Sequence, residues 1–166
     1  TATYCVNIDS VEVVDTLPMS SLFKSGKIVC LLDTASAAML GAIDKMEICG
    51  DYVIAMDRDV RHQLCVFDRN GKFLHAIGAK GNGKGEYADL LDFTCDSGEG
   101  LIYILDGKGG KIHSYSISEG EYKKSVDCSN EYVNIKYAHS CLYCYHPSLN
   151  IGEGHAARLL LARREP

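Results

Sequence analysis

The chain has 166 residues, of which 46% are hydrophobic and 23% are charged, a composition typical of one soluble globular domain. Its formal net charge is −5 and no cluster of Lys and Arg exceeds a pair such as Arg163-Arg164, which argues against nucleic acid as a partner. The apolar stretches are too short to span a membrane, and Thr1–Ser10 lacks the basic and apolar segments of a signal peptide. The compartment stays open, because a mature exported protein would look the same after cleavage.

Alternation of apolar and polar residues, the period of a β-strand, predicts strands from the N-terminus onward. Two strands are expected in the first part of the chain, over Ile8–Val14 and Lys27–Asp33. A complete unit follows, with strands at Lys45–Ile48, Tyr52–Asp57, Gln63–Asp68 and Lys72–Ile77. Between the last two strands, Asn70-Gly71 predicts a tight hairpin turn, because both residues accept the positive φ that such a turn requires.

The same order of strands recurs further along the chain. Leu101–Asp106 repeats the pattern of Tyr52–Asp57, and the two aspartates that end these strands are 49 residues apart. The remaining expected elements are, in chain order, a strand at Lys111–Tyr115, a turn at Glu119-Gly120, and strands at Glu131–Ile135 and Cys141–His146. Near the C-terminus, Ala156–Arg164 is predicted to form a short helix.

A four-strand unit that recurs every ~40–50 residues is typical of β-propeller blades. The expected fold class is therefore all-β, with blades of four antiparallel strands in a partial ring or in a ring completed by oligomerisation. Within a single domain, we expect N-terminal strands in 1–42, a first full blade in 43–78, a second in 79–128, the start of a third in 129–150 and a tail in 151–166.

Four segments resemble a known family: Phe67–Phe73, Ile77-Gly78, Gly81–Tyr87 and Ile102–Asp106 look like NHL-type repeats. The nearest resemblance is to the six-bladed β-propeller proteins of gut Bacteroidetes. It implies a non-enzymatic module that binds a small molecule, a glycan or a protein through loops around a central channel, in the periplasm or cell envelope. Two alternatives stay open. One is an NHL-like lyase or hydrolase with a metal in the channel, and the other is a truncated propeller without independent activity.

Two motifs suggest chemistry that their details do not support. Gly78–Lys84 has the spacing of a phosphate-binding loop, but Gly85 stands where Ser or Thr would hold magnesium, and a strand follows. We therefore expect a connection between blades, with no nucleotide or other cofactor. His139–His146 contains two His and two Cys, the ligand types of a zinc site, but on a strand Cys141 and Cys144 face opposite sides. These residues are predicted to belong to a strand and not to a metal site.

Residues at the ends of equivalent strands are the candidates for ligand binding. Asp57 and Asp106 close corresponding strands, Arg58 follows the first, and His146 closes a strand of the third copy. In one interpretation the aspartates organise turns by accepting hydrogen bonds from nearby backbone amides. In the other, these side chains converge at the mouth of the central channel and bind a ligand. No serine–histidine–acid set is recognisable from motifs, so no catalytic residue is assigned.

The eight cysteines are interpreted as mainly reduced strand residues. Six of them lie in apolar, β-branched or aromatic runs: Cys30, Cys49, Cys65, Cys95, Cys141 and Cys144. In an exported protein, some of them could form disulfides. The strands left over at the two ends of the chain together equal one four-strand blade. Two chains could complete each other in this way, so a homodimer with six blades is one hypothesis.

Overall fold

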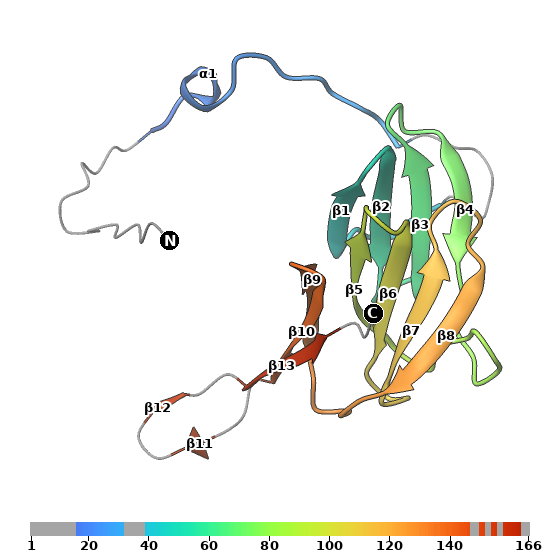
Figure 1. Ribbon diagram of the computed structural model, residues 1–166. Helices are drawn as coiled ribbons and strands as arrows, with labels where there is room; N and C mark the ends of the chain where they lie inside the picture. Colours follow the sequence, from blue (N-terminus) through green and yellow to red (C-terminus); the bar gives the residue numbers. More distant parts are fainter. Residues whose placement is uncertain (1–15, 32–38, 147–149, 152–153, 156–157, 164–166) are drawn as a thin grey trace.

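The computed structural model describes residues 16–31, 39–146, 150–151, 154–155 and 158–163. The regular structure in these ranges is β, apart from the short helix α1 (Met19–Leu22), which lies away from the sheets (Figure 1). The two largest sheets are antiparallel, follow one another along the chain and lie side by side (Figure 1). The all-β fold class predicted from the alternating pattern is confirmed.

The first sheet is a four-stranded antiparallel meander in which every strand pairs with the next in the chain. Its strands are β1 (Lys45–Cys49), β2 (Tyr52–Asp57), β3 (Gln63–Asp68) and β4 (Phe73–Ile77). Each lies within one residue of its predicted bounds, because apolar alternation and turn residues are both local signals.

The second sheet repeats the design of the first, again with each strand paired to the next. Its strands are β5 (Leu90–Asp96), β6 (Leu101–Asp106), β7 (Lys111–Ser116) and β8 (Tyr122–Asp127). Two successive four-stranded meanders of this kind confirm the prediction of propeller blades of four antiparallel strands.

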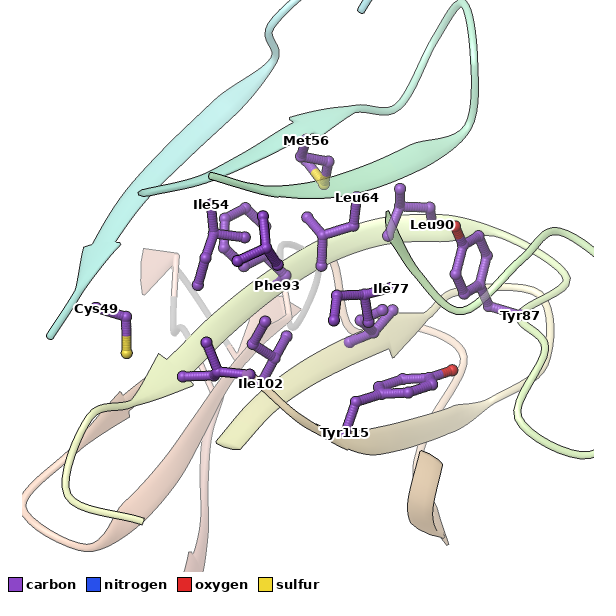
Figure 2. Close-up of a cluster of buried hydrophobic side chains, with 13 residues drawn as sticks. Cys49, Ile54, Met56, Leu64, Ile77, Tyr87, Leu90, Phe93, Ile102 and Tyr115 are labelled. Carbon is purple, nitrogen blue, oxygen red and sulfur yellow. The ribbon is translucent and has the colours of Figure 1, made fainter. Parts of the chain in front are cut away.

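The main hydrophobic core lies between these two blades (Figure 2). Figure 2 shows Ile54 and Leu64 of the first blade pointing toward Phe93 and Ile102 of the second. All four side chains are fully buried. Burying one such side chain stabilises a fold by roughly 1.5–3 kcal/mol, so this interface is a main source of cohesion between the blades.

The third sheet has an unexpected outer strand. β9 (Asn134–Ala138) pairs with β10 (Cys141–His146), and β10 pairs on its other side with β13 (Arg158–Arg163). The short hairpin of β11 (Asn150–Ile151) and β12 (Gly154–His155) lies between β10 and β13 in the chain.

β13 occupies the stretch in which a short helix was predicted, so that prediction is wrong. The run Leu159–Leu161 is apolar enough for either structure, and pairing along β10 provides hydrogen-bond partners for its backbone. β9 is displaced as well, since it begins at Asn134 and not at Glu131.

In the N-terminal segment, the structure describes only part of one of the two predicted strands. Residues 27–31 belong to no strand, so that prediction is wrong for the described part of Lys27–Asp33, and Ile8–Val14 lies outside the described residues. Leu31 and Leu40 instead pack onto the face of the first blade that is turned away from the second blade. Part of the segment therefore covers apolar residues of β2 and β3.

The turn between β3 and β4 is formed by Gly71 and an aspartate. Gly71 has a φ of 86°, whereas Asn70 is not among the residues with positive φ, so the expectation holds for Gly71 alone. The Oδ1 atom of Asp68 accepts hydrogen bonds from the N–H groups of Asn70 (2.8 Å) and Lys72 (3.0 Å). The side chain of Asp68 thus supplies part of the hydrogen bonding of this turn.

The cysteines are mostly placed as predicted. No disulfide joins the seven cysteines that the structure describes. Cys49, Cys65 and Cys144 are buried, in agreement with their apolar surroundings in the sequence. Cys30 is exposed, so the prediction of a strand residue is wrong there, because the segment that carries it joins no sheet.

Candidate functional site

A polar pocket of about 370 Å³ opens beside the second blade. One wall is the 81–86 loop between β4 and β5, and the other is formed by β7 and β8. Its side chains carry amide, amine, carboxyl, imidazole and hydroxyl groups: Asn82, Lys84, Glu86, Asp106, Lys111, His113, Tyr122 and Ser125. The pocket therefore combines hydrogen-bonding groups of a loop with those of an outer strand pair.

Hydrogen bonds hold the 81–86 loop in a compact form. The N–H of Gly81 donates to the Tyr87 carbonyl oxygen at 3.0 Å, and the N–H of Gly83 donates to the Glu86 carboxylate at 2.7 Å. Gly85 has a φ of 77° and packs so closely on Tyr122 that a Cβ would lie 2.9 Å from the Tyr122 Cβ. Glycine at this position lets the loop close onto β8 and form the pocket wall.

A chain of hydrogen-bonded side chains forms the back of the pocket. His113 Nδ1 lies 2.7 Å from Ser125 Oγ, and His113 Nε2 lies 3.3 Å from Asp106 Oδ2. The Tyr122 hydroxyl lies 2.7 Å from the same Ser125 Oγ. The β-sheet register explains the first contact, since His113 and Ser125 are directly opposite each other on β7 and β8.

Asp106 is buried and stays ionised in this arrangement. Burial by itself would raise the pKa of the Asp106 carboxyl, but hydrogen bonds outweigh it and the pKa lies below its ordinary value. These bonds come from the N–H groups of Ala88, Gly109 and Asp89, at 2.8–2.9 Å, and from the His113 ring. The carboxylate thus joins the entry to β5, the β6–β7 turn and the histidine.

Two lysines of the pocket form no ion pair with the described residues. Lys84 and Lys111 are both exposed, and neither forms an ion pair within the part of the chain that the structure describes. Both pocket carboxylates, by contrast, accept hydrogen bonds from the chain itself: Glu86 from Gly83, and Asp106 from the groups given above. Two ammonium groups are therefore available to an anion.

The predicted site residue Asp57 has the same structural role as Asp106. Its Oδ2 accepts hydrogen bonds from the N–H groups of Gly41 (2.5 Å) and Ala42 (3.1 Å), and its Oδ1 accepts from Val60 (3.0 Å) and Arg61 (2.9 Å). The carboxylate therefore ties the segment before β1 to the turn after β2. This geometry matches the interpretation in which the aspartates organise turns.

The other predicted residues lie elsewhere. Arg58 points to its neighbour Asp59, at 2.8 Å between Nε and Oδ1. The Nε2 atom of His146 lies 2.8 Å from a carboxylate oxygen of Glu131. Of the four candidates, only Asp106 lines the pocket, and ligand binding by the other three stays a prediction.

A ladder of charges links the first strands of the three sheets. Lys45 Nζ on β1 lies 2.7 Å from Asp92 Oδ1 on β5, and Lys136 Nζ on β9 lies 2.8 Å from Glu47 Oε1 on β1. Both carboxylates are thus paired with lysines. The described residues include no group of three or more His, Cys, Asp or Glu that could hold a metal ion.

The sequence-based reasoning missed His113, Tyr122 and Ser125. The turn at Glu119-Gly120 marks the hairpin that carries these residues, but it does not by itself give their pairing. Extending the hairpin back from this turn, with the irregularity between Ser114 and Tyr115, places His113 opposite Ser125. That irregularity has no clear mark in the sequence, so only the structure gives the register.

Solved structures resemble this fold at low sequence identity. A protein of Bacteroides fragilis that is named as exported matches with a TM-score of 0.64 and 20% identity, over 74% of this chain and 34% of its own. The hydrazine synthase of Kuenenia stuttgartiensis matches with a TM-score of 0.53 and 10% identity, over 65% and 30%. The WD40 β-propeller domain of Doa1 has a TM-score of 0.45 and 14% identity, over 65% and 37%. The chain spans about a third of the length of these proteins, and the likeness concerns the fold alone.

No curated protein matches the chain. In its described part, no helix is long and apolar enough to cross a membrane.

Family membership follows from the sequence itself. A family model described as "Domain of unknown function (DUF4934)" matches residues 3–165, which is nearly the whole chain. This chain therefore belongs to the DUF4934 family.

Proposed function

We propose that this chain is a binding module of a β-propeller, and that the pocket beside the second blade receives a small organic anion of sugar-acid size. The observation that carries the proposal is that the ammonium groups of Lys84 and Lys111 form no ion pair with any described residue, at a pocket whose carboxylates already accept hydrogen bonds from the chain. An anion entering there gains charge-assisted hydrogen bonds without having to break an existing ion pair.

The size and lining of the pocket support this ligand class. A volume of about 370 Å³ is at the lower end of the range for ligand sites, which is roughly 300–1,000 Å³. Asn82, Tyr122 and Ser125 offer amide and hydroxyl groups that match the hydroxyl groups of a sugar. A sugar acid combines these hydroxyls with the carboxylate that the lysines attract.

The setting of the module is part of the same proposal. The NHL-like segments support assignment to six-bladed propellers of the Bacteroidetes type. The exported protein of Bacteroides fragilis, whose fold is similar, supports a periplasmic or envelope location. A module that captures small acidic saccharides fits such a location, where these molecules are met outside the cytoplasm.

Isothermal titration of the full chain with glucuronate, and with glucose as the neutral analogue, tests the proposal. We expect glucuronate to bind and glucose to bind at least about tenfold more weakly, a difference of about 1.4 kcal/mol. The double variant Lys84→Met/Lys111→Met is expected to lose the preference for glucuronate, because the remaining contacts are uncharged.

Lys124→Met is the matched control, because Lys124 is exposed on the same strand as Ser125 but faces the opposite side. It should bind glucuronate as the unmodified chain does. Equal affinity for glucose and glucuronate, or unchanged glucuronate binding by the double variant, would show that the lysines do not form an anion site.

A further inference from the structure

Ser125 has the surroundings of an activated nucleophile. Its Oγ is 2.7 Å from His113 Nδ1 and lines the pocket, so a ligand there can reach it. The opposite ring nitrogen, Nε2, is 3.3 Å from Asp106 Oδ2. A serine, a histidine and a carboxylate are therefore connected in a row along the wall of the pocket.

The chemistry of these groups gives the hydrogen bonds a direction. An ionised carboxylate only accepts hydrogen bonds, so the Asp106 contact places the imidazole proton on Nε2. Nδ1 of a neutral ring then carries the lone pair, and it accepts the hydrogen bond that the Ser125 hydroxyl donates. The Tyr122 hydroxyl, 2.7 Å away, is free to donate to the Ser125 oxygen. The serine proton thus points at a base.

We infer that Ser125 is a catalytic nucleophile for the hydrolysis of small carboxylic esters, with His113 as its general base and Asp106 as a positioning residue. The inference rests on the proposed function only for its preferred substrates, esters that carry an anionic group near Lys84 and Lys111. The reactivity of Ser125 itself needs only the row of three side chains and access from the pocket.

The reaction balances with ester and water alone. Ser125 Oγ forms a bond to the ester carbonyl carbon while its proton passes to His113 Nδ1. The bond from that carbon to the alcohol oxygen breaks, and the alcohol leaves with the proton from Nδ1. Water then attacks the acyl-serine, gives a proton to Nδ1 and releases the acid, and Ser125 Oγ takes that proton back.

A neutral fluorophosphonate tests the nucleophile in the unmodified full chain. It reacts with an activated serine by forming a P–O bond and releasing fluoride, and peptide mass spectrometry locates the adduct. Ser97, which is exposed in the β5–β6 turn, is the internal comparison. We expect Ser125 to react at least about 100-fold faster than Ser97, the lower limit of what a positioned general base contributes.

Two variants sharpen the result. His113→Asn is expected to lose the adduct at Ser125, with its folding checked by circular dichroism, and Lys124→Met is expected to keep it. Equal labelling of Ser97 and Ser125, no labelling, or undiminished labelling in a folded His113→Asn chain would overturn the inference. Glucuronate binding without labelling of Ser125 would support the proposed binding function and contradict the nucleophile. Labelling of Ser125 without glucuronate binding would support the nucleophile and contradict the proposed anion site.

Discussion

Replacing Asp57 by alanine should strongly destabilise the first blade. The carboxylate of Asp57 is fully buried and accepts four backbone hydrogen bonds, two from Gly41 and Ala42 and two from Val60 and Arg61. A hydrogen bond to a charged group contributes about 1.5–3 kcal/mol. Because the four donor residues are exposed and water can replace part of the loss, we expect a total of about 3–4 kcal/mol. That is a large share of the roughly 5–15 kcal/mol by which domains are stable.

Urea unfolding followed by circular dichroism measures this change. The midpoint should fall for Asp57→Ala, and fall less for Asp57→Asn, which keeps an acceptor oxygen but loses the charge. Asp59→Ala is the control, because the exposed Asp59 is hydrogen-bonded to the side chain of its neighbour Arg58 at the surface, and its midpoint should stay at that of the unmodified chain. Equal midpoints for Asp57→Ala and Asp59→Ala would refute the assigned role of Asp57.

The stability that the Asp57 carboxylate contributes should decrease in acid. Burial by itself would raise the pKa of the Asp57 carboxyl, but the four N–H donors outweigh it, so the folded pKa lies below the unfolded value of about 3.9. The stabilisation is then complete above that unfolded value and is lost as the pH falls through the folded pKa. The difference in stability between the unmodified chain and Asp57→Ala should narrow in acid.

Three further measurements test other parts of the structure. Burial raises the pKa of both Cys65 and Cys144 to about 11. Iodoacetamide at pH 8 should therefore label the exposed Cys30 first and reach the two buried cysteines only on unfolding. Early labelling of all three would contradict the burial of Cys65 and Cys144. Lys45→Met removes the ion pair between β1 and β5 and should lower the free energy of unfolding by about 2 kcal/mol. Lys136→Met should lower it less, because the Lys136 ammonium is largely exposed. A larger loss of stability for Lys136→Met than for Lys45→Met would be inconsistent with the ladder of charges. The homodimer hypothesis has lost part of its basis, since residues 27–31 belong to no strand; light scattering at several concentrations tests it, and a constant 18.2 kDa would end it.

The four strands of the first blade and the two middle strands of the second could be predicted because their signals are local. Tyr52–Asp57 and Leu101–Asp106 show an apolar run that ends on an aspartate, and the structure has both strands with these bounds. The C-terminal prediction failed because Leu159–Leu161 is compatible with a helix or a strand. Pairing with β10, which is distant in the sequence, selects the strand.

The candidate site, too, could be predicted only in part from the sequence. Asp106 was identifiable from its position at a strand end, but its partners were not, because they come from three separate segments. The sequence by itself determined the blade repeat, since alternation and turn residues act over a few neighbours. Only the tertiary structure decided that the 81–86 loop folds against β8 and that His113 faces Ser125. Those contacts depend on strand register and on packing between distant segments, which no local pattern specifies.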